Sequence, residues 1–270
     1  MGSLHVKVMS LNIRYDNPHD GSNSWPHRKT LVCDVLRENA PDFIGLQEAL
    51  KHQLEDIIHA LEGYDGYGRS RRAYTEDDEW SPLCYDSKRW WLDQRQRGTF
   101  WLSDTPDHEG SQSWGSSLPR IVTWARFIEK QTNEGIYVYN THFDHRSSEA
   151  RLQSAKLLIQ RIQSRECQHE PFLLMGDLNA GENTPPLRYL KGNEHTMPLV
   201  DTFREKHPDE RKAGTFGGWS GSKSGPKIDY ILIDAHAQTT LHDAQIIYTS
   251  KDGRYPSDHF PITAELTFSG

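Results

Sequence analysis

The sequence is poor in cysteine, and its three cysteines, Cys33, Cys84 and Cys167, show no CxxC spacing. An odd number without that spacing argues against a disulfide framework and against a thiolate zinc site. The chain also lacks an apolar run of about 18 residues, the length that a membrane-spanning helix needs. We therefore expect reduced, buried thiols and no membrane-spanning helix.

A surplus of positive charge is missing too. With 31 basic and 38 acidic residues, the formal charge is -7, so the surface lacks the general positive field that favours non-specific binding to duplex nucleic acid. Any recognition of phosphate must then be local. No flexible linker, block of like charges or internal repeat divides the chain. The sequence therefore predicts a single domain over residues 1–270.

The first residues show no charged segment followed by an apolar one, the pattern of a signal peptide. The sequence thus favours a cytoplasmic location, although a leader removed earlier would leave no trace. No membrane-binding hairpin or lipid anchor is recognisable. Nothing in the sequence indicates an obligate protein partner.

Short apolar runs rich in β-branched and aromatic residues predominate, which is typical of strands. They predict strands at about residues 4–12, 42–47, 81–86, 97–102, 120–130, 135–141, 171–176, 227–234, 243–249 and 261–268. Helical periodicity predicts helices around residues 31–36, 50–61, 152–162 and 185–191. Many strands with few helices predict an α/β sandwich of two packed sheets with helices on the outer faces.

Polar side chains recur at or near the ends of the predicted strands. Each is of a type that can bind a metal, contact a phosphate or transfer a proton: Asn12, Glu48, His142, Asp177 with Asn179, Asp229, and Asp258 with His259. One acid at a strand end is ordinary in a chain that is 26% charged. Six such positions predict a common site.

Asp229 lies inside the apolar run KIDYILI. Burying an ionised carboxylate costs several kcal/mol unless it is paired. His259 would serve as its partner, because a carboxylate holds the imidazole tautomer and stabilises its charged form. Glu48 and Asp258, with the amide of Asn12, form an oxygen-rich set that suits Mg²⁺ or Mn²⁺. Such an ion orients a phosphate while an acid or imidazole deprotonates the attacking water.

Six segments resemble, in order and spacing, the motifs of the endonuclease/exonuclease/phosphatase superfamily: MSLNIRYD, GLQEA, NTHFDH, MGDLNA, KIDYIL and YPSDHFPI. They span residues 9 to 262. The resemblance implies a four-layer αββα sandwich of the deoxyribonuclease I type, with two mixed sheets flanked by helices. It also implies a Mg²⁺- or Mn²⁺-dependent hydrolase of phosphate esters, a nuclease or a phosphatase, that works by in-line attack of an activated water.

The resemblance further implies roles for individual residues. Glu48 resembles the main metal carboxylate, with Asn12 assisting the metal and the phosphate and Asp258 on the metal side. Asp177 and Asn179 resemble the pair that positions or activates the water and contacts the phosphate.

The two histidines carry separate implications. His259, paired with Asp229, resembles the essential histidine of the family. His142 resembles a histidine of the deoxyribonuclease I and sphingomyelinase branches, which stabilises or protonates the departing oxygen. Abasic endonucleases have a tyrosine in that region, which speaks against an abasic-site activity here. Whether Asp177 or His259 is the general base stays open, because coupled groups share that role.

Cationic candidates for phosphate binding are Arg14, which lies two residues past Asn12, and Arg120. The run Arg69, Arg71 and Arg72 is expected to form a solvated face that the following TEDDE segment balances. The glycine-rich stretch 214–226 is expected to be a flexible loop near Asp229.

The sequence leaves two alternative functions open and does not identify the substrate. The segment HFDH resembles the tail of a zinc-hydrolase motif, but Asn140 stands where the first histidine of that motif would be. Asp144 and His145 either line the pocket or bond the start of the next helix. A zinc-dependent hydrolase and a catalytically inactive binding domain of the same fold are the alternatives. The expected substrate is a phosphorylated small molecule, a sugar phosphate or a short single-stranded nucleic acid.

Overall fold

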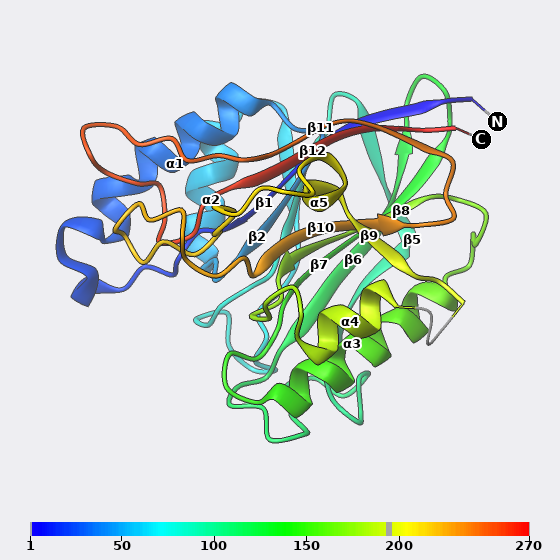
Figure 1. The fold of residues 1–270 in the computed structure, drawn as a ribbon, viewed down its shortest axis with the longest axis horizontal. Helices are drawn as coiled ribbons and strands as arrows, with labels where there is room; N and C mark the ends of the chain where they lie inside the picture. Colours follow the sequence, from blue (N-terminus) through cyan, green and yellow to red (C-terminus); the bar gives the residue numbers. More distant parts are fainter. Residues whose placement is uncertain (1, 193–195, 270) are drawn as a thin grey trace.

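Two six-stranded sheets pack face to face, and helices cover both outer faces (Figure 1). The computed structural model describes residues 2–192 and 196–269. The four layers and the mixed sheets are those predicted from the sequence, so that prediction is confirmed.

The first sheet combines strands from both ends of the chain. In spatial order its strands are β11 (Thr239–Ile246), β12 (Ile262–Phe268), β1 (Leu4–Asn12), β2 (Phe43–Gln47), β4 (Leu83–Asp86) and β3 (Tyr64–Tyr67). Its outer face is covered by α1 (Trp25–Asn39), which follows the short 3-10 helix η1 (Pro18–Asn23), and by α2 (Lys51–Ala60).

The second sheet is built from the middle of the chain. Its order is β5 (Trp90–Trp101), β6 (Ile121–Glu129), β7 (Gly135–His142), β8 (Phe172–Asp177), β10 (Asp229–Asp234) and β9 (Leu199–Asp201). On its outer face lie α3 (Ser148–Gln163) and α4 (Pro185–Lys191), while α5 (Thr202–Lys206) follows the edge strand β9.

The ten predicted strands are present, whereas β3, β9 and α5 were not predicted from the sequence. These elements have four, three and five residues, too few for an alternating or helical pattern to stand out. The strand predicted at 97–102 begins earlier, at Trp90, because residues 90–92 also pair with β6, before a register shift at the polar residues 93–96. The helix predicted around 31–36 likewise begins earlier, at Trp25.

Each central strand is buried on both faces. All eight residues of β7 are buried, which explains its nearly continuous apolar sequence. Because neighbouring side chains on a strand alternate in direction, Val138 belongs to the core between the sheets, while Tyr137 and Tyr139 pack under α3. The apolar pattern of the strand therefore fixes both layers at once.

A buried amide joins the two sheets beneath the polar strand ends. Nδ2 of Asn140 on β7 donates to the carbonyl oxygens of Leu46 and Pro82, at 2.7 and 2.8 Å. Its Oδ1 accepts from Nε2 of Gln47 at 2.7 Å. A Cβ on Gly45 would lie 2.7 Å from that Oδ1, so glycine is needed there for the close approach of the sheets.

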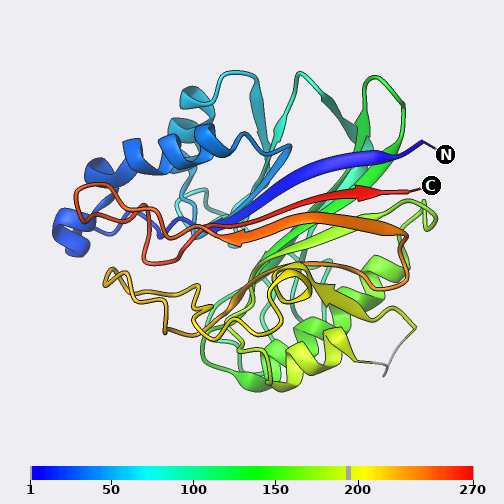
Figure 2. The ribbon, with the colours of Figure 1, turned by 45° about the horizontal axis from the view of Figure 1, so that its top comes forward.

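The topology brings the polar strand ends to one edge. In each sheet the two central strands run parallel, β1 beside β2 and β7 beside β8, so their carboxyl ends meet at one edge. Strands β12 and β10 run antiparallel to β1 and β8 and therefore begin at that edge. At the opposite edge, Leu4 pairs with Phe268 and the chain ends lie side by side (Figure 2).

Candidate active site

Three neighbouring strands of the second sheet place their polar ends side by side. In the strand register, Asp177 at the end of β8 is paired with His142 on β7 and with Asp229 on β10. All three side chains are buried. Gly176 has a φ of +149°, and a Cβ there would lie 2.0 Å from the carbonyl oxygen of Thr141. The glycine of the MGDLNA segment is thus required for β8 to run this close to β7.

His259 comes from the first sheet but reaches into the second. It lies in the segment before β12, and its Nδ1 is 2.9 Å from Oδ2 of Asp229, the pair predicted from the sequence. Its Nε2 is 3.7 Å from Oδ2 of Asp177. The ring of Phe216, an exposed residue in the loop before β10, meets the imidazole edge to face at 5.0 Å. The sequence had predicted this stretch, residues 214–226, to be a flexible loop near Asp229, without a role for Phe216.

Burial and charge shift the proton affinities of this group in opposite directions. Burial and the neighbouring Asp229 raise the pKa of Asp177 to about 7, although His259 opposes that rise. Burial alone would lower the pKa of His259, but the carboxylates of Asp229 and Asp177 outweigh it and raise it to about 10. A cationic imidazole thus lies beside a carboxyl group that titrates near neutrality.

His142 has the opposite character. Burial, together with the charges of Arg120 and Arg71, places the pKa of His142 well below its usual value, so the ring is neutral. Nδ2 of Asn179 donates to its Nε2 at 3.0 Å and to the carbonyl oxygen of Phe143 at 3.0 Å. In this arrangement Nε2 of His142 is an acceptor and carries no proton.

One asparagine connects the two sheets across the site. Nδ2 of Asn12, at the end of β1, donates to Oε1 of Glu48 at 3.0 Å and to Oδ2 of Asp177 at 3.1 Å. Its Oδ1 accepts from the backbone N–H of Arg14 at 2.9 Å. Asn12 thus turns its nitrogen toward both carboxylates and orients Glu48, while the metal contact expected of Asn12 from the sequence stays a prediction.

Arg14, Glu48 and Asn179 have left-handed backbone conformations, with φ of 56°, 58° and 46°. Such conformations cost about 1–3 kcal/mol each for residues with side chains and persist only where the surroundings impose them. Here the backbone N–H of Tyr15 contacts Oε2 of Glu48 at 3.3 Å, and the N–H of Asn179 donates to Oδ1 of Asp177 at 2.9 Å. The turns thus aim the side chains into one site.

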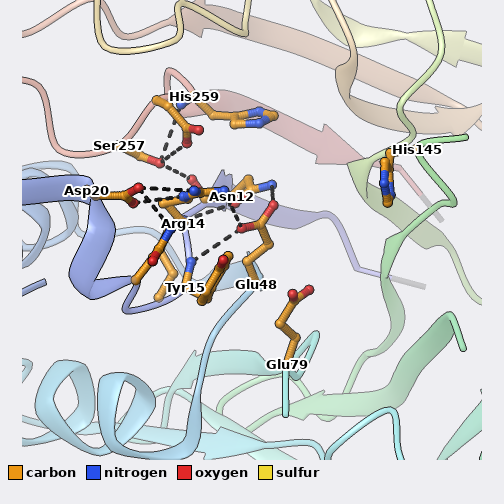
Figure 3. A network of polar contacts seen from close by, with 12 residues as sticks. Asn12, Arg14, Tyr15, Asp20, Glu48, Glu79, His145, Ser257 and His259 are labelled. Carbon is orange, nitrogen blue, oxygen red and sulfur yellow. Dashed lines mark hydrogen bonds and ion pairs between the residues drawn. The ribbon is translucent and has the colours of Figure 1, made fainter. Parts of the chain in front are cut away.

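The Arg14 guanidinium is already paired. Its Nε and Nη2 donate to the two oxygens of Asp20 in η1, at 2.9 and 3.1 Å, and its Nη1 is 3.9 Å from Oε2 of Glu48. Figure 3 shows this chain of contacts from Asp20 through Arg14 to Glu48. Arg14 thus borders the site as predicted, but its charge is largely neutralised by Asp20, which sequence analysis had not singled out.

The charges of Glu48 and Asp258 act on each other. Burial raises the pKa of Asp258, and although His259 opposes the rise, the charge of Glu48 adds to it. Two carboxylates that repel each other at a partly buried position are suitable donors for a hard divalent cation that retains some of its waters. The carboxylate of Asp258 otherwise contacts the hydroxyl of Ser257 at 3.2 Å.

A different group of residues has the spacing of metal ligands. One donor atom each of Asp177, Asp229 and His259 lies within 4.8 Å of the others. Because Nδ1 of His259 is already at hydrogen-bond distance from Asp229, we interpret this group as a proton-transfer unit. It contains none of the residues of the HFDH segment.

The HFDH segment does not gather as a zinc site would. Both oxygens of Asp144 are used: they accept from Ser117, including its N–H at 2.8 Å, and from the N–H of Ser147 at 2.6 Å before α3. Nδ1 of His145 contacts Nη2 of Arg120 at 3.1 Å. Asp144 therefore supports the start of the helix, one of the two readings left open by the sequence.

One arginine of the run Arg69, Arg71 and Arg72 is not solvated as the sequence predicted. Arg71, expected on a solvated face, is buried and paired with Asp78 and Glu79 of the following acidic segment. Glu79 and His145 lie on either side of the space next to Glu48 (Figure 3). The charges of the segment were recognisable, but their burial depends on the folding of the loop between β3 and β4.

A sandwich of two mixed sheets with carboxylates, amides and imidazoles gathered at one edge is the architecture of metal-dependent phosphoesterases of the deoxyribonuclease I type. The chain belongs to the endonuclease/exonuclease/phosphatase family, whose model matches residues 9–259. No helix among the described residues is long and apolar enough to cross a membrane.

Relatives of the chain include both phosphatases and nucleases. A structure of an endonuclease/exonuclease/phosphatase from Bacteroides vulgatus is 30% identical, covers 98% of this chain and all of its own, and superposes with a TM-score of 0.87. The mannosyl-6-phosphatase of Bacteroides thetaiotaomicron is 29% identical, with 97% and 99% coverage and a TM-score of 0.86. The DNA repair nuclease APEX1 of Danio rerio is 23% identical over 98% of this chain and 83% of its own.

Proposed function

We propose that the chain is a divalent-metal-dependent phosphoesterase that hydrolyses a phosphate monoester of a small, hydroxyl-rich molecule. The observation that carries the proposal is the contact of the two sheets at one edge, where Asn12 joins Glu48 to Asp177 and His259 joins Asp229. The similarity to a mannosyl-6-phosphatase over nearly the whole chain supports the choice of substrate class.

Glu48 and Asp258 would hold the metal, with Asn12 orienting Glu48. When bound, Mg²⁺ or Mn²⁺ would neutralise the charge of the phosphate and hold it in line for attack. Arg14 borders this side, and its Nη1, 3.9 Å from Glu48, is close enough to reach a phosphate oxygen.

Asp177 acts as the general base in this proposal. A pKa of about 7 is suited to taking a proton from water at neutral pH. Both N–H groups of the Asn179 amide are donated, to His142 and to the carbonyl oxygen of Phe143, which leaves its Oδ1 to accept a hydrogen bond from the attacking water. The neutral His142 fixes the position of Asn179, whereas the family resemblance had implied that it stabilises or protonates the departing oxygen.

His259 supplies positive charge to the reacting phosphate. Its imidazolium, held at Nδ1 by Asp229, presents Nε2 toward the site near Asp177. Preorganised charge of this kind stabilises the negative oxygens that develop in the transition state. Asp177 takes one proton from the attacking water, and the imidazolium donates its Nε2 proton to the departing oxygen, so that the product leaves as an alcohol.

The test compares substrate classes with and without metal. Purified protein is assayed with a hexose 6-phosphate, nitrophenyl phosphate, bis-nitrophenyl phosphate and short RNA and DNA strands, with Mg²⁺, Mn²⁺, Zn²⁺ or EDTA. We expect monoester hydrolysis with Mg²⁺ or Mn²⁺ that EDTA abolishes. Preferential cleavage of the strands would favour a nuclease, activity with zinc alone a zinc hydrolase, and no hydrolysis at all a binding domain.

Glu48→Gln tests the metal side of the same proposal. Loss of this carboxylate should raise the Mg²⁺ concentration for half-maximal activity by at least about tenfold, since even residues that only support metal ligands alter affinity by about 10–100-fold. Glu265→Gln, which removes a half-exposed partner of His5 on β12, is the matched control. An unchanged metal requirement in Glu48→Gln would refute the assignment.

A further inference from the structure

A second cluster of charged side chains lies beside the metal side of the candidate site. The backbone N–H of Trp80 donates to the carbonyl oxygen of Ala49 at 2.7 Å, which places Glu79 next to Glu48. Arg120 immediately precedes β6, whose Val122 is paired with Thr141 near the end of β7. Both residues therefore stand at the same edge as the strand ends described above.

Arg71 holds Glu79 in a fixed orientation. Nη1 and Nη2 of the buried Arg71 donate to the two oxygens of Glu79, at 2.7 and 3.0 Å. A carboxylate oxygen has a second lone pair, so each oxygen of Glu79 can accept another hydrogen bond. Figure 3 shows Glu79 pointing toward Glu48, into the space that His145 borders from the other side.

Arg120 is buried but poorly partnered. Its residue is 5% exposed, and among the described residues its guanidinium makes one hydrogen bond, to Nδ1 of His145. Its Nε is buried without a partner, and no carboxylate of the described chain lies within ion-pair distance. A guanidinium has five N–H donors, and leaving them unpaired away from water is costly.

Glu79 and Arg120 influence each other electrostatically without a direct polar contact. Burial lowers the pKa of Arg120, and the charge of Glu79 is the strongest influence opposing that shift. The two side chains nevertheless form no hydrogen bond or ion pair in the described structure. A hydroxyl group donates and accepts at once, so a hydroxyl between them would donate to Glu79 and accept from Arg120.

The charges of the cluster favour a neutral ligand group. Arg71, Arg72 and Arg120 contribute three positive charges, while Glu48, Asp78 and Glu79 contribute three negative ones, so no surplus positive charge remains for a second phosphate. Resting on the proposed function, which places the substrate phosphate beside Glu48, we propose that Glu79 and Arg120 form a hydroxyl-binding subsite that recognises the carbohydrate portion of the substrate.

The test compares two esters that differ in their hydroxyls. Arg120→Met removes the donors at similar size, and Arg69→Met, which unpairs the exposed Glu109, is the control. We expect Arg120→Met to lower kcat/KM for a hexose 6-phosphate at least tenfold, mainly by raising KM. For nitrophenyl phosphate, kcat/KM should fall less than threefold. Equal losses of kcat/KM for the two esters would mean that Arg120 binds the phosphate. No loss for either ester would mean that the substrate does not contact Arg120. Either result overturns the subsite.

A binding measurement separates this proposal from the proposed function and from misfolding. Calorimetric titration with a hexose 6-phosphate and with inorganic phosphate requires no turnover. We expect the wild type to bind the hexose ester at least tenfold more tightly, and Arg120→Met and Glu79→Gln, each with a melting temperature near that of wild type, to lose the difference. Equal affinities in the wild type would refute the subsite even if the enzyme hydrolyses monoesters. Turnover of no ester, with the affinity difference intact, would refute only the proposed function.

Discussion

The two sheets contribute opposite halves of the candidate site, and they surround them differently. On the first sheet, the side chains of Glu48 and Arg14 are 15% and 25% exposed. On the second, those of His142 and Asp177 are 7% and 2% exposed. A hard cation keeps several waters, so the wetter half suits a metal. Desolvation alters proton affinity, so the drier half suits acid-base chemistry.

His259 breaks this division. Its backbone belongs to the segment that leads into β12 of the first sheet, but its side chain contacts Asp229 and approaches Asp177 of the second. The drier half therefore depends on a group that the other sheet supplies. Catalysis by this arrangement requires the two sheets to keep a fixed separation.

The largest expected effect comes from removing that shared group. His259→Ala should lower kcat by about 10²–10⁴-fold, the range for a positioned acid-base group, and Asp229→Asn should lower it less. Because the pair acts as a unit, the double variant should be little worse than His259→Ala. Steady-state kinetics with saturating Mg²⁺ measures the cycle.

The control for the cycle is His5→Ala, which removes an exposed histidine on β1 and should leave kcat unchanged. Circular dichroism verifies that each variant is folded. If the losses in kcat from His259→Ala and Asp229→Asn multiply in the double variant, the two residues do not act as one unit. The choice between Asp177 and His259 as the general base would then be open again.

A smaller effect is expected at the seam between the sheets. Asn140→Ala removes three buried hydrogen bonds that join the two sheets. A hydrogen bond of this kind contributes about 0.5–1.5 kcal/mol, so the free energy of unfolding should fall by about 2–4 kcal/mol. Urea titration measures it.

A variant on the outer face of the second sheet serves as the comparison. Leu158→Ala in α3 removes a buried apolar side chain at about 2–5 kcal/mol without touching the seam. If Asn140 sets the separation of the sheets, Asn140→Ala should also lower kcat under native conditions, whereas Leu158→Ala should not. Equal effects on kcat would show that the seam has no special part in the site.

The sequence predicted the layers and the residues at the strand ends because both depend on local pattern. Alternating apolar residues mark the strands, and Glu48 or Asp177 stands out by following a buried run. The pairing of Asp229 with His259 was predictable because a buried carboxylate needs a partner. These inferences require no knowledge of distances.

What the sequence did not show depends on side-chain direction and on loops. That Asn12 turns its nitrogen to Glu48 follows from the hydrogen bond of its oxygen with Arg14, which no spacing reveals. The burial of Arg71 beside Glu79 depends on an irregular segment that folds back on β2. Short elements such as β9 have too few residues for a periodic signal.

The smallest predicted effect concerns Asp144, which lies close to the site residues of the second sheet but bonds the turn before α3. Burial would raise the pKa of Asp144, but hydrogen bonds from Ser117, Ser147 and Arg146 outweigh it and hold that pKa well below its usual value. A carboxyl whose pKa is depressed by folding stabilises the protein above the unfolded value of about 3.9 and loses that contribution as pH falls.

Asp144→Asn should therefore lower the free energy of unfolding by about 1–3 kcal/mol at pH 7, and its difference from wild type should shrink as the pH falls from about 5 toward 3. Urea titrations across that range measure the effect. Because the carboxylate bonds the turn before α3 and not the strand ends, kcat at pH 7 should change less than threefold. A difference in stability that is constant with pH would mean that the asparagine disturbs packing, and a large loss of kcat would move Asp144 from the support of the helix into the site.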